Sequence, residues 1–226
     1  MSDPLPLLPA VSLTTGVVDV WVLDLDLPLE ERHALTAPLD DSERTQWTRM
    51  RAGGDRWAVA RGARRHVLAS YLGVAPSKLR FGRGPFGKPW LTDHDALRFS
   101  ASARGGWALL AVADGIELGA DLEHEHTATE PDAVAREFLS PIERAAIAAV
   151  PPGERRRAFA LAWARHESLR KLHGTGIGEP LPVTSGAVPV VVRNVRAPEH
   201  HVAAVAARSV DWGVRVREFA SELATR

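Results

Sequence analysis

Two acidic side chains near the middle of this 226-residue chain have the type and spacing of metal ligands. Asp121 and Glu123 close the apolar segment GIELGADLE, residues 115–123. If the segment is a strand, both carboxylates point to one face, because strand side chains alternate with a period of two. Adjacent carboxylates repel each other unless a positive charge lies between them. On this pattern alone a solvated strand end is the simpler explanation, so the interpretation depends on the rest of the sequence.

A third acid and a lysine follow on a helical segment, AFALAWARHESLRKLHG, at residues 158–174. Glu167 and Lys171 lie one turn apart there, and a surface ion pair of little energetic value is the simplest explanation. The face of the helix that carries Glu167 and Lys171 begins with aromatic residues and ends in charged ones, however. This face therefore leaves the core at a defined point. If that point lies beside Asp121 and Glu123, three carboxylates converge as ligands for a hard cation such as Mg²⁺. The lysine can then neutralise a phosphate bound to the same ion.

Several other motifs are incomplete. Residues 82–88 match the first seven positions of a P-loop, but Pro89 replaces the Mg²⁺-binding Ser or Thr and no long helix follows, so a nucleotide triphosphatase is excluded. Lys88 remains on a glycine–proline turn, either positioned by that turn or simply solvated. The chain has no cysteine, which excludes disulfides and thiolate chemistry. The histidines lack a zinc-ligand spacing, and no Gly-x-Ser-x-Gly elbow supports a serine hydrolase.

The composition is that of an ordinary globular protein, with 45% hydrophobic and 25% charged residues. Basic and acidic residues number 28 each, which argues against a nucleic-acid-binding protein that works through bulk charge. No apolar run approaches the roughly 20 residues that cross a bilayer. The N-terminus lacks the basic start and apolar core of a signal peptide. We therefore expect a cytoplasmic protein that binds neither nucleic acid nor membrane.

The elements that must position the candidate residues are strands and amphipathic helices in alternation. We expect a strand at residues 17–27, a helix at 55–73 that ends at a glycine, several short strands, and further helices up to residue 174. Asp40, Asp41 or Ser42 would cap a short helix before residue 55. The tail, with PVVVRNV, HVAAVAAR and GVRVREF, has the pattern of an antiparallel meander.

The order of these elements occurs twice along the chain. A strand that ends in acids, a Glu-Arg pair and a long helix follow one another in both parts, with the pairs at 43–44 and 143–144. The repetition predicts an α+β fold of two similar halves, residues 1–115 and 116–226. Ligands commonly bind in the cleft between such halves.

The motifs, taken in order, resemble those of the 4′-phosphopantetheinyl transferases of the surfactin-synthetase type. That family carries Gly-Lys-Pro, Phe-x-x-Ser-His, Gly-x-Asp-x-Glu and Trp-x-x-Lys-Glu-x-x-x-Lys segments. The resemblance spans roughly residues 40–180 and is fairly specific when the motifs are combined. The corresponding residues here are Gly87-Lys88-Pro89, Phe99-Ser100-Ala101-Ser102-Ala103, Gly119-Ala120-Asp121-Leu122-Glu123, and Trp163 to Glu167 followed by Lys171 and Gly174.

The resemblance implies two pseudo-symmetric α+β halves with the active site in their cleft. It implies transfer of the phosphopantetheine arm of coenzyme A to a serine of an acyl or peptidyl carrier protein, with release of adenosine 3′,5′-bisphosphate. Asp121, Glu123 and Glu167 would hold Mg²⁺, or Mn²⁺ in its place. Glu167 would take the serine proton, and Lys171 would stabilise the leaving group. The residues expected to contact coenzyme A are Arg44, Arg61, Lys88, Ser102, Arg104 and Lys171.

The chain departs from the family pattern at two positions. Ala103 replaces a histidine expected near the 3′-phosphate of the coenzyme, and Arg104 is a candidate substitute. His166 replaces a lysine and loses a fixed charge at neutral pH. An inactive homologue that binds coenzyme A or a carrier protein, and a Mg²⁺-dependent phosphoesterase, are therefore alternatives to the transferase. We expect the chain to act as a monomer.

Overall fold

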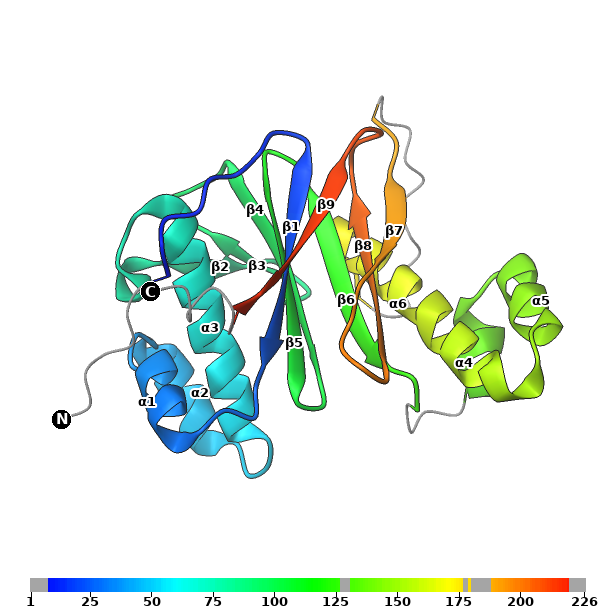
Figure 1. Cartoon of the computed structure of the whole chain (residues 1–226), viewed down its shortest axis with the longest axis horizontal. Coiled ribbons are helices and arrows are strands. Elements are labelled where there is room, and N and C mark those ends of the chain that lie inside the picture. The colour runs from blue at the N-terminus through cyan, green and yellow to red at the C-terminus, as the bar shows by residue number, and fades with distance from the viewer. Residues whose placement is uncertain (1–7, 127–130, 177–178, 180–187, 220–226) are drawn as a thin grey trace.

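The structure is a computed structural model that describes residues 8–126, 131–176, 179 and 188–219 (Figure 1). It has the predicted α+β fold. The strands are β1 (Val17–Asp24), β2 (Phe81–Arg83), β3 (Pro89–Leu91), β4 (Leu97–Arg104), β5 (Trp107–Asp114), β6 (Leu118–His124), β7 (Val191–Val195), β8 (His201–Ala207) and β9 (Gly213–Glu218). The helices are α1 (Leu29–Thr36), α2 (Asp41–Arg49), α3 (Gly54–Leu72), α4 (Pro131–Phe138), α5 (Pro141–Ala149) and α6 (Arg155–His173), with 3₁₀ turns at Pro76–Lys78 and Pro152–Glu154.

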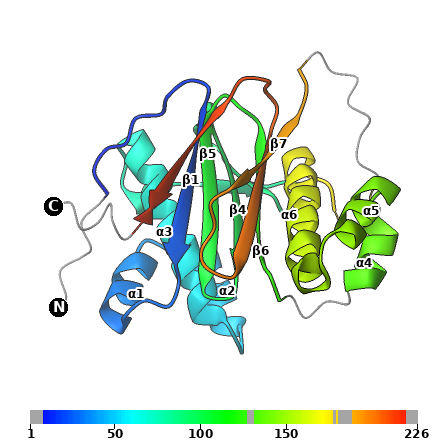
Figure 2. The ribbon, with the colours of Figure 1, turned by 45° about the vertical axis from the view of Figure 1, so that its right-hand side comes forward.

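Two sheets and two long helices form the layers that position the site. A four-stranded sheet in the order β4-β5-β1-β9 has α3 on one face, and a three-stranded sheet in the order β6-β8-β7 has α6 on one face. The other faces of the two sheets pack against each other, as Val20 and Leu109 of the first and Leu118 and Val205 of the second show by their common core. The order of layers is therefore helix, sheet, sheet, helix (Figure 2).

The two long helices are alike in length and in the way they end. Helices α3 and α6 have 19 residues each, and both stop at a glycine in the left-handed conformation, Gly73 and Gly174. The short helix α2 begins with a capping box, in which Asp40 Oδ1 accepts from the backbone N–H of Glu43 at 2.9 Å. Of the three caps that the sequence left open, Asp40, Asp41 and Ser42, the structure has Asp40. Helix α1 has no counterpart among the elements expected from the sequence.

The prediction of an antiparallel meander for the tail is wrong for its last strand. Strands β7 and β8 pair antiparallel, but β9 leaves them and pairs in parallel with β1, with Val17 opposite Gly213. The cause is a charge that the alternation pattern does not show, because arginines of β9 bind the buried Asp19 on β1. The division after residue 115 stays a prediction, and β9, at residues 213–218, crosses it.

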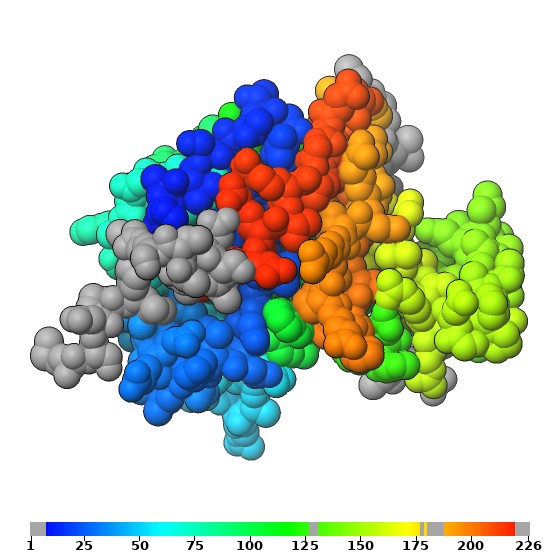
Figure 3. All heavy atoms as spheres, in the orientation of Figure 1, coloured from blue at the N-terminus to red at the C-terminus, as the bar shows by residue number. Residues whose placement is uncertain are grey.

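The space-filling view shows β9 lying between the N-terminal segment and the strands β7 and β8 (Figure 3). Helices α4 and α5 project to one side of the remaining molecule. Within the described ranges, no helix has both the length and the apolar character that a membrane span requires.

Candidate active site

The acidic end of strand β6 alternates as the sequence predicts. Leu118, Ala120 and Leu122 belong to the core between the sheets. Asp121 and Glu123 point to the opposite face, and both side chains are buried although they are charged. Such burial requires compensation by a positive charge or by hydrogen bonds.

Helix α6 lies unusually close to β6, and Gly119 is the residue that permits it. A Cβ atom at this position would lie 2.0 Å from the carbonyl oxygen of Ser168 and 2.3 Å from the backbone nitrogen of Leu172. Only a residue without a side chain fits there. The contact places Glu167 and Lys171, on the same stretch of α6, next to the two acids of β6.

Asp121 has one satisfied oxygen and one unsatisfied oxygen. Its Oδ1 accepts from the Lys171 ammonium at 2.7 Å and from the Ser102 hydroxyl at 2.8 Å. Its Oδ2 is buried without a partner in the described part of the chain, and so is Oε1 of Glu167. Unpaired buried carboxylate oxygens are energetically costly, so these atoms suit a positively charged ligand.

The electrostatics show that the three carboxylates are close enough to repel. Burial raises the pKa of Glu123 to about 6, and the charges of Asp121 and Glu167 add to this effect. Burial also raises the pKa of Glu167, and Asp121 again contributes. The charges of the three carboxylates therefore interact, with Lys171 and Arg104 as compensating charges, and their joint binding of a metal ion stays a prediction.

Cationic side chains bind the acids in this structure. Besides Lys171 on Asp121, the Arg104 Nε lies 2.9 Å from Oε2 of Glu123. As the side chains stand, the described residues contain no group of three His, Cys, Asp or Glu positioned to hold a metal ion. The donor set of three carboxylates with unpaired oxygens nevertheless suits a hard divalent cation.

Two adjoining cavities lie beside helix α3, and Lys171 and Ser102, the two side chains that bind Asp121, each line one of them. The larger, of about 230 Å³, lies between helix α3, the turn at residues 86–89 and the end of helix α6, and it has a strongly cationic wall. The smaller, of about 140 Å³, lies between helix α3 and strands β4 and β5, and Ala103 is on its wall. The charged residues on their walls are Arg61 and Arg64, shared by both cavities, and Lys88 and Lys171 in the larger one.

The structure brings some of the expected coenzyme-binding residues to these cavities and not others. Arg61, Lys88 and Lys171 line the larger cavity, and Ser102 lines the smaller. Arg44 is exposed and donates from Nε to the carbonyl of Leu39 at 2.9 Å, away from both cavity walls. Arg104 is bound to Glu123 as described above and also lies outside the two walls.

Lys88 has contacts that the sequence does not reveal. Its ammonium donates to Glu117, to the carbonyl oxygen of Leu118 at 3.1 Å, and to that of Leu172 at 3.3 Å. Lys88 thus connects the start of β6 with the end of α6, the two elements that carry the acids. Glu117 was not a candidate from the sequence, because a single acid before a strand has no distinguishing pattern.

Arg64 is the second residue that the sequence analysis missed as a site residue. It lies in a run of buried residues on α3, from Gly62 to Ser70, and its side chain is itself buried. A charged residue on the apolar stripe of a helix is the signal that could have singled it out.

Comparison with known proteins agrees with this geometry. The model of the 4′-phosphopantetheinyl transferase superfamily matches residues 117–216, which include β6 and α6. The 4′-phosphopantetheinyl transferase HetI of Nostoc sp. is 30% identical over 180 residues, 77% of this chain and 76% of that protein. The chain belongs to this family. The transferase moves the phosphopantetheine group of coenzyme A to a carrier protein.

Further relatives match shorter parts of the transferase. The 4′-phosphopantetheinyl transferase Sfp of Bacillus subtilis is 29% identical over 119 residues, 52% of this chain and 51% of that protein. The L-aminoadipate-semialdehyde dehydrogenase-phosphopantetheinyl transferase of Eremothecium gossypii is 33% identical over 138 residues, 59% of this chain and 50% of that protein.

Proposed function

We propose that this transferase works with Mg²⁺, or Mn²⁺, bound by Asp121, Glu123 and Glu167. The observation that carries the proposal is the pair of buried, unpartnered oxygens, Oδ2 of Asp121 and Oε1 of Glu167. When bound there, the ion supplies positive charge to the phosphoryl group that is transferred. Lys171 binds Asp121 and lines the larger cavity, and it would neutralise the phosphates that the ion holds.

The reaction requires a base and a stabilised leaving group. The hydroxyl oxygen of a carrier-protein serine forms a bond to the phosphorus next to pantetheine, and the pyrophosphate P–O bond breaks. The raised pKa of Glu167 makes this carboxylate a suitable acceptor for the serine proton. Adenosine 3′,5′-bisphosphate leaves with the electron pair, and Lys171 stabilises its negative charge.

The remaining candidate residues are expected to position coenzyme A. Arg61 and Lys88 on the cavity wall, with Arg44, Ser102 and Arg104, stay predicted contacts of coenzyme A. The mutual arrangement of Lys88, Leu118 and Leu172 supports a further role for Lys88 in holding β6 against α6. We propose a cytoplasmic monomer that binds neither nucleic acid nor membrane.

The first experiment measures the mass of an apo carrier protein after incubation with the transferase, coenzyme A and Mg²⁺. We expect a gain of one phosphopantetheine, which disappears in EDTA and returns when Mg²⁺ is added back. Glu167→Gln should lower the rate by about 10²–10⁴-fold, because a positioned general base contributes that much. Glu199→Gln, at an exposed position, serves as the control and should retain the wild-type rate.

The other outcomes distinguish the alternatives. Free phosphopantetheine without a modified carrier would identify a phosphoesterase. Tight binding of coenzyme A without any gain in carrier mass, across several carriers, would identify a binding protein and contradict the proposal. A gain in carrier mass without any metal would show that the transfer does not need the proposed ion.

A further inference from the structure

Strand β4, an edge strand of the four-stranded sheet, lies beside strand β6, an edge strand of the three-stranded sheet. Phe99 of β4 belongs to the core under helix α3. Because side chains alternate along a strand, Ser100 and Ser102 point to the opposite face. Their partners across the ladder, Ala111 and Leu109, are apolar and belong to the core between the sheets. Two serines on this apolar face therefore need polar partners.

The partner of Ser100 is the main chain of β6. Ser100 is 3% exposed, and its Oγ accepts a hydrogen bond from the backbone N–H of Ala120 at 2.9 Å. Strand β6 lies at the edge of its sheet, so its outer backbone groups have no neighbouring strand in that sheet. Ala120 is fully buried, so bulk water does not serve as the acceptor. The serine oxygen therefore takes the place of a ladder bond directly before Asp121.

Two further bonds hold the same stretch of β6. The Lys88 ammonium donates to the carbonyl oxygen of Leu118 at 3.1 Å, and the Ser102 hydroxyl donates to Oδ1 of Asp121 at 2.8 Å. The bond to Ser100 lies between these two along the strand. Ser102 holds the carboxylate itself, whereas Ser100 holds the main chain from which that carboxylate extends.

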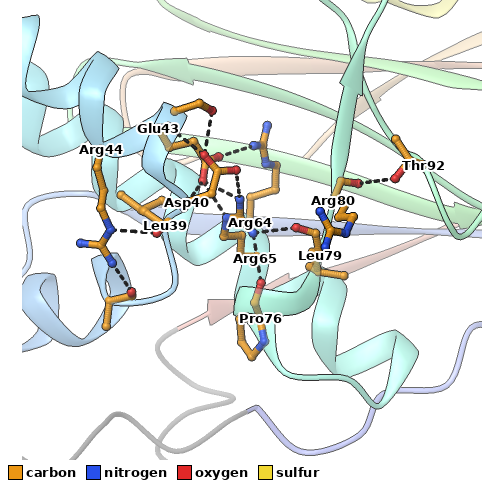
Figure 4. A network of polar contacts seen from close by, with 12 residues as sticks. Leu39, Asp40, Glu43, Arg44, Arg64, Arg65, Pro76, Leu79, Arg80 and Thr92 are labelled. Atoms are coloured by element: carbon orange, nitrogen blue, oxygen red, sulfur yellow. Dashed lines mark hydrogen bonds and ion pairs between the residues drawn. The ribbon is translucent and has the colours of Figure 1, made fainter.

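Helix α3 fixes strand β4 from the other side of the sheet. Phe99 of β4 shares a core with apolar residues of α3. The helix is held in turn by Arg65, which is fully buried and donates to Glu43 at 2.7 Å, to Asp40 at 2.6 Å and to two backbone carbonyls (Figure 4). A buried polar network that is satisfied in this way makes its surroundings rigid. Ser100 thus connects β6 to a well-fixed strand.

We propose that Ser100 is a positioning residue of the transferase, which places Asp121 for the metal ion through the main chain of Ala120. The inference rests on the proposed function, because it takes Asp121 as a ligand of Mg²⁺ or Mn²⁺. Without the serine oxygen, the buried N–H of Ala120 loses its acceptor, and β6 has to shift to regain one. Groups that hold a metal ligand from behind usually contribute about 10- to 100-fold to metal affinity or activity.

The test measures the binding of Mn²⁺ to the substrate-free protein by calorimetry. Ser100→Ala should weaken this binding by about tenfold or more. In the carrier-modification assay its lower rate should recover as the Mn²⁺ concentration is raised, because a weaker site fills at a higher concentration, and the KM for coenzyme A should not change. Ser70→Ala is the matched control. Ser70 is a buried serine of α3 that donates to the carbonyl oxygen of Val67 at 2.7 Å, and its loss should leave the Mn²⁺ affinity unchanged.

A second variant keeps the test decisive if Ser100→Ala fails to fold. Ser100→Cys has nearly the size of the wild-type side chain, but its sulfur is a weak acceptor, so it should also weaken Mn²⁺ binding. A lower melting temperature with an unchanged Mn²⁺ affinity would show that Ser100 only supports the fold. A higher KM for coenzyme A with an unchanged Mn²⁺ affinity would make Ser100 a substrate contact on the wall of the larger cavity, which it lines. Either result would overturn the inference.

The same titration tests the proposed metal site separately. Wild-type protein that binds no Mn²⁺, or Asp121→Asn that binds it as tightly as wild type, would contradict the proposed function and this inference with it. If wild type binds Mn²⁺ and Asp121→Asn does not, the metal site stands, and the Ser100 variants then decide the inference alone.

Discussion

Glu123 is a residue whose environment opposes its charge. It is 8% exposed, and its pKa of about 6 lies above the ordinary value of 4.5 because of burial and the neighbouring carboxylates. A folded protein that binds a proton more tightly than the unfolded chain loses stability as that proton leaves. The ionised form of Glu123 therefore destabilises the folded protein, and the cation proposed to bind there would offset this cost.

The first prediction concerns this pH dependence. Without metal, the contribution of Glu123 to the free energy of unfolding should be largest below pH 4.5 and should fall as the pH rises through about 6. Glu123→Gln cannot titrate and should lack this decrease. Urea unfolding in EDTA between pH 4.5 and pH 7.5 measures both proteins. Parallel stability curves would show that Glu123 has an ordinary pKa.

The second prediction concerns Lys171, which occupies Oδ1 of Asp121. A metal ion on the same carboxylate has to overcome the repulsion of the ammonium, since like charges at short range oppose each other. Lys171→Met should therefore raise the affinity of the free protein for Mn²⁺ by about fivefold or more. Calorimetry with Mn²⁺ alone measures it, and exposed Lys78→Met is the control. An unchanged affinity would exclude Asp121 as a ligand.

At the scale of elements, the site depends on the contact between β6 and α6. Gly119 permits this contact, and Lys88 connects the same two elements through the carbonyls of Leu118 and Leu172. The acids of β6 face those of α6 only while the contact persists. The same positions are therefore important for folding and for catalysis.

The third prediction is that Gly119→Ala separates the two elements. Its methyl group would overlap backbone atoms of Ser168 and Leu172, which cannot rotate away, so the helix must shift. We expect a loss of stability of about 1–3 kcal/mol or more and a large decrease in kcat. Thermal unfolding and the carrier-modification rate measure the two effects. Gly153→Ala, where a Cβ meets nothing within 4 Å, should be neutral.

At the scale of the whole molecule, a buried ion cluster joins strand β9 to strand β1. Asp19 on β1 is 1% exposed and accepts two bonds from Arg215, at 2.6 and 2.8 Å, and one from Arg217 at 3.2 Å. Tyr71 of α3 donates a further bond at 2.6 Å. The cluster joins the last strand to the first strand and thus ties residues at opposite ends of the described sequence.

The fourth prediction is that this cluster dominates the attachment of β9. Asp19→Asn removes the buried negative charge that the two arginines share and should lower the free energy of unfolding by about 3 kcal/mol or more, as expected for a broken buried ion pair. Arg196→Met, which removes the exposed contact of 3.9 Å with Glu218, should change it by less than about 1 kcal/mol. Urea unfolding compares the two. Equal effects would mean that the cluster does not hold β9.

The sequence by itself determined the local features of this protein. Alternation placed Asp121 and Glu123 on one face of a strand, and the helical period placed Glu167 and Lys171 one turn apart, because both patterns follow from backbone geometry. The combined motifs also indicated the family. The sequence likewise offered Asp40 as one of three possible caps, because capping bonds such as those between Asp40 and Glu43 join residues only three positions apart.

Only the tertiary structure decided which distant groups meet. It showed that β9 pairs with β1, that Lys88 binds carbonyls of two elements, and that Arg64 keeps unsatisfied donors on a cavity wall while Arg65 does not. Adjacent arginines are indistinguishable in a sequence pattern, because their roles depend on acceptors that come from remote parts of the chain. Burial and the sum of surrounding charges arise only when the layers pack, and they set the chemistry of each group.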